Sequence, residues 1–181
     1  MTALALGTGV WYAATLVLNL IAAEWAPVTN PAMQWMSEQI RILGEKPATA
    51  ILLFAGLAAA PAICEELLFR GVVLTALRDR FRPKTGVIIS SLLFSVYHLN
   101  PAQMPTAFVL GLILGWLTLR SGSIWPAILV HALHNGCLLA FHLWAPQTGD
   151  ISAWYHLLLV GPMIGLTLLF SSSLISPTHR A

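Results

Sequence analysis

Long apolar blocks alternate with short polar stretches along the chain, and each block is close to the length of a membrane-spanning helix. The blocks cover residues 3–23, 49–77, 85–99, 106–119, 124–144 and 153–170. A helix of about 20 apolar residues crosses the hydrocarbon core of a bilayer. The pattern therefore predicts an all-α integral membrane protein, built as a multi-span bundle of about six transmembrane helices.

Two segments depart from this simple pattern. Block 49–77 is long for one span and contains Pro61, which predicts either a kinked helix or two end-to-end helices. Between the first two blocks, apolar residues recur at helical spacing at Met33, Met36, Ile40 and Leu43. Segment 31–43 is therefore expected either to lie on the outer surface as a short amphipathic helix or to form a polar connector with partial helicity.

The basic residues between the blocks predict the orientation. If the N-terminus faces the cytoplasm, the inside segments hold six basic residues: Arg78, Arg80, Arg82, Lys84, Arg120 and Arg180. The outside segments then hold only Arg41 and Lys46. Cytoplasmic loops carry the excess of Lys and Arg, so we expect an N-in, C-in topology.

The composition agrees with membrane insertion. Hydrophobic residues make up 57% of the 181 residues, charged residues make up 9%, and the mean hydropathy is +0.78. Soluble domains carry about 25% charged residues, so a soluble, extracellular or nucleic-acid-binding domain is excluded. Cys64 and Cys137 lie far apart inside apolar blocks, which indicates neither a disulfide framework nor a cysteine metal site.

Ionisable residues inside the apolar blocks mark the place to look for chemistry, because each costs a few kcal/mol near the bilayer centre unless it faces a partner or water. In the second block, Glu66 and Arg70 are four residues apart and share a helix face, which predicts an ion pair. Glu65 points about 100° away from Glu66. An unpaired acid in such a place suits a general base, although a charge network that only fixes helix packing is the alternative.

Two further polar patterns follow. Phe94 and His98 are four residues apart and are expected to stack on one helix face. His131, His134 and Asn135 share about one face of the fifth block. The histidines at this spacing could be metal ligands, or His131 and Asn135 could donate hydrogen bonds to an oxyanion.

The positions of the three patterns predict that they meet. Glu65 and His98 both lie about 20 Å into the membrane, counted from the basic segment 78–84 that separates their blocks. His131 lies about 16 Å from the same side, counted from Arg120. These depths agree to about one helical turn. We therefore expect the three patterns to form one site inside the bundle.

The order EExxxR, FxxxH and HxxxN on successive helices resembles the CPBP intramembrane endopeptidases, the CAAX-processing and bacteriocin-processing family also called the Abi domain family. The resemblance covers about residues 49–144, which would be the protease core. Residues 1–48 would then be a first transmembrane helix with an outer connector, and 145–181 a last transmembrane helix with a cytoplasmic tail. Family members often have two or more spans before the first motif, so a partner chain or self-association could supply further walls.

The resemblance implies a role for each motif residue. Glu65 would activate the attacking water with help from His98, while Glu66 and Arg70 would orient their helix. His131 and Asn135 would stabilise the oxyanion. Both metal-dependent and metal-free mechanisms have been proposed for this family: a zinc would be held by Glu65, His98 and His131, but the sequence has no HExxH motif. We prefer the glutamate general base.

The function expected from these observations is an intramembrane endopeptidase in a bacterial inner membrane. Its partners would be the bilayer and a peptide or protein substrate, prenylated or otherwise membrane-associated, with no nucleic acid. Two hypotheses from other classes stay open. One is a non-catalytic membrane scaffold or immunity protein that retains the motifs, and the other is a transporter or metal-binding bundle in which the same residues hold an ion.

Overall fold

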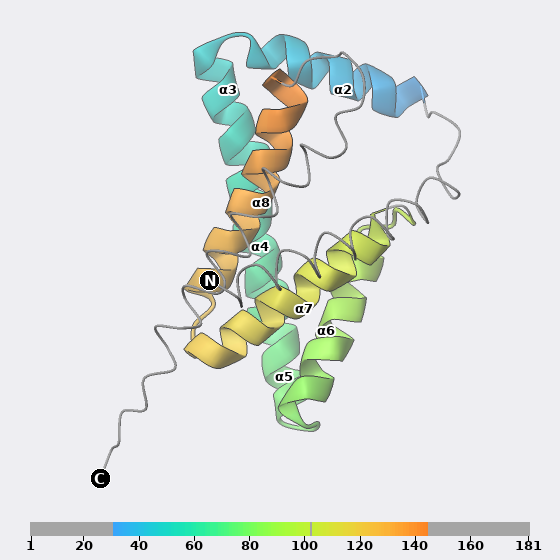
Figure 1. Cartoon of the computed structure of the whole chain (residues 1–181), viewed down its shortest axis with the longest axis vertical. Helices are drawn as coiled ribbons and strands as arrows, with labels where there is room; N and C mark the ends of the chain where they lie inside the picture. The colour runs from blue at the N-terminus through green and yellow to red at the C-terminus, as the bar shows by residue number, and fades with distance from the viewer. Residues whose placement is uncertain (1–30, 102, 145–181) are drawn as a thin grey trace, which may run out of the picture.

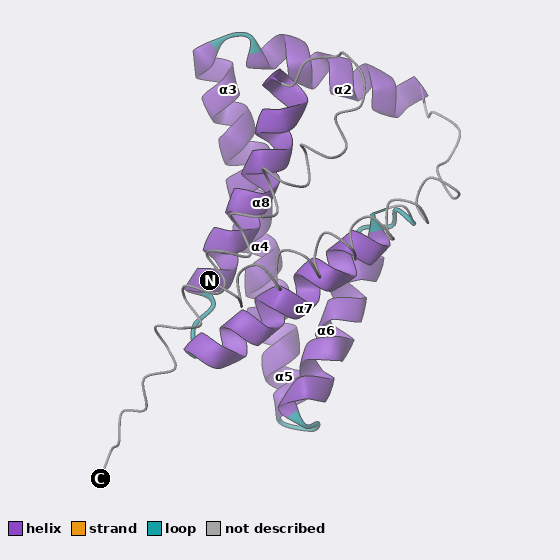
Figure 2. Cartoon of the chain, in the orientation of Figure 1, coloured by secondary structure: helices purple, strands orange, loops and turns teal. Residues whose placement is uncertain are grey.

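The computed structural model describes residues 31–101 and 103–144, and every regular element within these ranges is a helix (Figure 2). This confirms the all-α fold class for the described part of the chain. The predicted helices at 3–23 and 153–170 lie outside the described residues.

A surface helix, α2 (Pro31–Gly44), comes before the long central helix. It runs across the ends of α3 and α8 in the view of Figure 1. Gly44 permits a tight contact there, because a Cβ atom at this position would collide with the side chain of Leu143. The helicity expected for residues 31–43 is confirmed.

The central helix is one continuous helix of 32 residues from Pro47 to Arg78. Its five consecutive parts are α3 (Pro47–Leu53), η1 (Phe54–Ala59), α4 (Ala60–Glu66), η2 (Leu67–Val73) and α5 (Leu74–Arg78), of which η1 and η2 are π-helical. The alternative prediction of two end-to-end helices for this block is therefore wrong. Proline lacks an N–H and crowds the carbonyl four residues back, and the wide turns of η1 just before Pro61 accommodate it without ending the helix.

Three more helices follow: α6 (Pro83–Tyr97), α7 (Met104–Ser121) and α8 (Trp125–Trp144). Each end lies within two residues of its predicted block. A proline occupies one of the first two positions of each helix, where its missing N–H costs no hydrogen bond. Helix α7 ends at Gly122, whose φ of 68° is in the left-handed region that glycine adopts without strain.

Helices α6 and α7 pack along each other through small residues, and α8 packs along η1 and α4 (Figure 1). A Cβ atom on Gly111 would lie 3.0 Å from the Cβ of Ser91, and one on Gly115 would lie 2.9 Å from a Val87 methyl group. The two glycines are four residues apart, the spacing that lets membrane helices approach closely. Phe94 and Leu114 are fully buried in the resulting core.

Two of the described helices are long and apolar enough to cross a membrane, Pro47–Arg78 and Met104–Ser121. Apolar side chains on the long helix face outward, with Ile51 70% and Leu52 69% exposed. A helix of 32 residues is about 48 Å long, against about 30 Å for the hydrocarbon core, so it must tilt or extend beyond the core. The count of six spans and the N-in, C-in topology stay predictions.

Candidate active site

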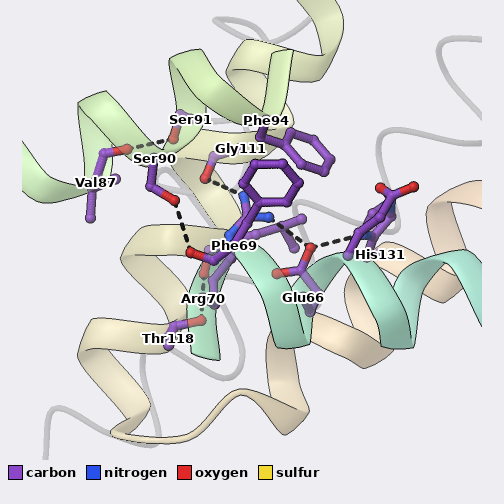
Figure 3. A network of polar contacts seen from close by, with 12 residues as sticks. Glu66, Phe69, Arg70, Val87, Ser90, Ser91, Phe94, Gly111, Thr118 and His131 are labelled. Carbon is purple, nitrogen blue, oxygen red and sulfur yellow. Dashed lines mark hydrogen bonds and ion pairs between the residues drawn. The ribbon is translucent and has the colours of Figure 1, made fainter. Parts of the chain in front are cut away.

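The three polar motifs lie together where α4 and η2 face α6 and α8 (Figure 3). His131 Nδ1 is 2.8 Å from Glu66 Oε1, which joins the third motif to the first. The His131 and Phe94 rings are 5.6 Å apart between centroids, which joins the third motif to the second. The three motifs, expected at a common depth, therefore meet in the structure.

Glu66 and Arg70 form the predicted ion pair. Arg70 Nη1 donates to Glu66 Oε1 at 2.8 Å, and both side chains are completely buried. The guanidinium also donates from Nη2 to the backbone carbonyl of Gly111 at 2.9 Å and has its central carbon 4.7 Å from the centroid of the Phe94 ring. A carboxylate, a carbonyl and an aromatic face contact this buried charge, while Arg70 Nε has no hydrogen-bond partner among the described residues.

His131 is oriented by the same carboxylate oxygen that binds Arg70. A carboxylate can only accept hydrogen bonds, so His131 Nδ1 donates its hydrogen to Glu66 Oε1. This contact fixes the plane of the imidazole and turns the other nitrogen, Nε2, toward Glu65. His131 Nε2 is 3.7 Å from Glu65 Oε2.

Both carboxylates of the motif keep an oxygen without a hydrogen-bond partner among the described residues, Glu65 Oε2 and Glu66 Oε2, and only Glu65 is partly exposed. Its side chain is 19% exposed, yet its Oε2 atom is buried and has no hydrogen-bond partner among the described residues. A buried acceptor without a partner is costly, so such an atom indicates a place for water or a ligand. At a separation of 3.7 Å, one water molecule can contact both Glu65 Oε2 and His131 Nε2.

Phe94 is the common neighbour of the two histidines. Its ring meets that of His98 at 4.8 Å between centroids and 74° between planes, which confirms the predicted contact on one helix face, in an edge-to-face rather than a stacked arrangement. His98 Nδ1 lies 2.8 Å from the Phe94 backbone carbonyl, to which it donates, so His98 Nε2 keeps a lone pair. Phe69 packs edge-on against Phe94 at 5.2 Å and completes the aromatic group.

Asn135 lies one helical turn beyond His131 on α8 and is half-buried. Residues four apart share a helix face, so the backbone directs Asn135 to the same side of α8 as His131. Its assignment to the oxyanion stays a prediction. His134 is also half-buried.

A protein-family model described as type II CAAX prenyl endopeptidase Rce1-like matches residues 47–137. These 91 residues (137 − 47 + 1) are half of the chain of 181. The chain belongs to this family. No curated protein and no solved structure matches the chain.

The match to the Rce1-like family begins at the first residue of α3 and ends in α8, and it contains all three motifs. It agrees with the family suggested by the order of the motifs. Membership of the Rce1-like family, together with the two long apolar helices, indicates a protein embedded in a membrane.

The donors in this Rce1-like site do not make up a three-ligand zinc site. Among the described residues, no group of three or more His, Cys, Asp or Glu side chains is arranged to hold a metal ion. Glu65 Oε2 and His131 Nε2 lie near each other, but a catalytic zinc takes three protein ligands and a water. The donor geometry therefore does not support the metalloendopeptidase interpretation.

Two features of the site went beyond what the motifs predicted. The first is the contact of His131 with Glu66, whose expected partner was Arg70 alone. The second is the Gly111 carbonyl as an acceptor for Arg70. The glycines at 111 and 115 were a signal for close helix packing, but a backbone carbonyl has no residue type by which a sequence could reveal it.

Proposed function

We propose that this chain is an intramembrane endopeptidase of the CAAX type that hydrolyses a peptide bond with a water activated by Glu65. The observation that carries the proposal is the buried, unpartnered Glu65 Oε2, 3.7 Å from His131 Nε2. Peptide hydrolysis needs a base for water and donors for the developing oxyanion, and the surrounding residues offer both.

The reaction would run in two proton-transfer steps. Glu65 Oε2 accepts a proton from the water, with His98 Nε2 accepting the other hydrogen bond of that water, and the oxygen attacks the peptide carbonyl carbon. The oxyanion then accepts hydrogen bonds from Asn135 and from His131 Nε2, which can donate when the imidazole carries a hydrogen on both nitrogens, with Nδ1–H still bonded to Glu66. When the tetrahedral intermediate collapses, the C–N bond breaks and Glu65 returns the proton to the leaving amine.

Glu66 and Arg70 would act through His131 rather than on the substrate. Glu66 Oε1 holds His131 Nδ1 at 2.8 Å, and Arg70 holds Glu66 at the same distance. A fixed imidazole needs no reorganisation when charge develops next to it, which is how preorganised donors lower a barrier. We therefore regard both as positioning residues.

The proposed setting is a bacterial inner membrane, with six spans and both termini in the cytoplasm. Glu65 lies 13 residues (78 − 65) before Arg78, about 20 Å along the helix from its basic end. Water and the substrate would reach the site from this cytoplasmic end. A peptide carrying a prenyl group, or one otherwise held at the membrane, would have to bring its scissile bond from that surface to Glu65, about 20 Å along the helix.

The deciding experiment compares Glu65→Gln and His98→Ala with the unchanged protein on fluorogenic peptides, with and without a farnesylated cysteine. We expect Glu65→Gln to lower kcat by about 10²–10⁴-fold, the usual contribution of a general base. Glu45→Gln is a matched control, because Glu45 is exposed beyond the end of α2. Undiminished turnover by folded Glu65→Gln protein would overturn the proposal.

These variants, together with His131→Ala, separate the two other functional classes. A scaffold or immunity protein that retains the motifs would lose thermal stability on Glu65→Gln or His98→Ala and would cleave no peptide in any form. A transporter would show an ion flux in proteoliposomes that disappears with His131→Ala. Either result in place of peptide cleavage would replace the peptidase assignment.

A further inference from the structure

Helix α2 exposes a stripe of large apolar side chains that no described part of the chain covers. Trp35 is 66% exposed, Met36 46%, Ile42 47% and Leu43 48%. Positions 35 and 42, and likewise 36 and 43, are seven residues apart, so the four side chains form two rows about 100° apart on one side of the helix, with Gln39 between the rows. We call these four residues the α2 stripe.

The opposite side of α2 is polar and internally neutralised. Glu38 and Arg41 lie about 100° and 160° around the helix from the centre of the α2 stripe. Arg41 Nη2 is 2.7 Å from Glu38 Oε1. The hydrogen bond from Arg41 holds the pKa of Glu38 below its ordinary value, and the same bond raises the pKa of Arg41. Both groups are therefore charged at neutral pH, and this side of the helix favours water.

The α2 stripe continues the apolar surface of the membrane-spanning helix. Only Glu45 and Lys46 separate α2 from α3, and Ile51 and Leu52 in the first turns of that helix are among the most exposed apolar residues described. The view in Figure 1 shows α2 lying across the end of α3 rather than extending it. Helix α2 therefore lies at the end of a helix that is long and apolar enough to cross a membrane.

Helix α2 packs closely against the ends of α3 and α8. Gly44 is buried against the side chain of Leu143 of α8, which would have to move if Gly44 were replaced by a larger residue. Thr49 Oγ1 donates to the backbone carbonyl of Leu43 across the turn between α2 and α3. These contacts hold α2 at a fixed angle, so its stripe faces a defined direction.

We propose that α2 lies in the plane of the membrane and that its stripe inserts into the boundary between lipid headgroups and acyl chains. The occupant of the exposed stripe is thus the lipid bilayer. A tryptophan on an amphipathic helix is typical of this boundary, where its apolar ring and its N–H are both accommodated. This position of α2 in the membrane requires no catalytic activity and is therefore independent of the peptidase assignment.

The test is a nitroxide scan of α2 in the full-length protein, reconstituted in phosphatidylcholine vesicles. Single cysteines would replace residues 35–43 and 45 in turn, leaving Gly44 unchanged, in a background with Cys64→Ala and Cys137→Ala. Retained cleavage or an unchanged thermal transition shows that each labelled protein is folded. The measurement is the accessibility of each nitroxide to oxygen, which concentrates in lipid, and to a nickel chelate, which stays in water.

We expect oxygen accessibility to rise and fall with a helical period, with maxima at the α2 stripe and minima at Glu38 and Arg41. The nickel chelate should show the opposite phase. The same pattern in the Glu65→Gln protein, which we expect to be inactive, would show that the position of α2 in the membrane does not depend on catalysis. A stripe accessible to the nickel chelate, or protected from both reagents by another segment or a second copy of the chain, would overturn the proposal.

Discussion

Arg70 donates a hydrogen bond from Nη2 to the backbone carbonyl of Gly111 at 2.9 Å, across 41 residues of sequence. The contact connects the long helix that carries the first motif to the middle of α7. It exists because Gly111 lets α7 approach α6 closely, with the absent Cβ only 3.0 Å from that of Ser91. The packing of α6 on α7 therefore positions a group that holds Glu66, and through it His131.

Gly111→Ala is expected to disturb the site from a distance. The new methyl group would meet Cβ and Cα atoms of Ser91 at 3.0 and 3.1 Å, and because one of these is backbone, α6 and α7 must separate. Overpacking of this kind costs about 1–3 kcal/mol of folding free energy. A lower melting temperature in detergent and a reduced kcat would be measured together.

Gly56→Ala is the matched control for this substitution. Gly56 also lies in a helical segment, but a Cβ there would meet nothing within 4 Å. Because alanine is favoured over glycine in helices by up to about 1 kcal/mol, the control should be neutral or slightly stabilising. Equal effects at positions 56 and 111 would refute the role of the close α6–α7 contact.

Arg70→Met should destabilise the protein strongly. It leaves the fully buried Glu66 carboxylate without its cation, and removal of one partner from a buried ion pair costs about 3–5 kcal/mol. The double variant Glu66→Gln/Arg70→Met should recover part of this loss, because no uncompensated charge remains. Chemical unfolding in mixed micelles measures both.

A control for the arginine prediction is Arg120→Met, at an exposed position in the last turn of α7. Surface substitutions of this kind change stability by about 0.5 kcal/mol or less. If the double variant were less stable than Arg70→Met alone, the ion pair would not be the reason that Arg70 matters.

The helices could be predicted well from the sequence because a bilayer leaves the backbone few choices. In hydrocarbon every N–H and C=O must be satisfied within the segment, so a long apolar block becomes a helix. The same reasoning could not place the π-helical turns beside Pro61. Their hydrogen-bond pattern depends on how the whole helix packs, and apolar periodicity does not record it.

The candidate site was predictable where it depends on spacing within one helix. Glu66 and Arg70 are four residues apart, as are Phe94 and His98, and both pairs are in contact. Contacts between helices were predicted only as a common depth. That His131 would bind Glu66 depends on the rotation of α8 against α4, which is decided by packing rather than by the spacing of polar residues.

Phe94→Leu should impair catalysis more than folding. The Phe94 ring lies against both histidines and beneath Arg70, at 4.7 to 5.6 Å from their centres. Leucine fills much of the same volume but offers no aromatic edge or face, and each aromatic contact is worth about 0.5–1.5 kcal/mol. We expect kcat to fall while KM stays near its original value, because the imidazoles lose their alignment without loss of substrate contacts.

The comparison for Phe94 is Phe81→Leu, at a position that is 47% exposed between α5 and α6. This variant should keep both kinetic constants. A Phe94→Leu protein with unchanged kcat, or one in which only KM rises, would show that the ring does not align the histidines.

Removal of metal ions should leave peptide cleavage intact. The site presents Glu65 Oε2 and His131 Nε2 as neighbouring donors, whereas a catalytic zinc takes three protein ligands. Purified protein is therefore expected to contain far less than one zinc per chain by elemental analysis. Its turnover of the fluorogenic peptide should be the same before and after dialysis against EDTA.

A loss of turnover on dialysis would need a second measurement, the addition of zinc, because a chelator can also affect the membrane preparation or the peptide. Two results together would contradict the metal-free mechanism. Activity would return on addition of zinc, and the unchanged protein would bind one zinc per chain whereas the His131→Ala protein would not. Activity that survives dialysis but disappears in Glu65→Gln would instead assign the water-activating role to the glutamate, since that carboxylate would be the base that remains.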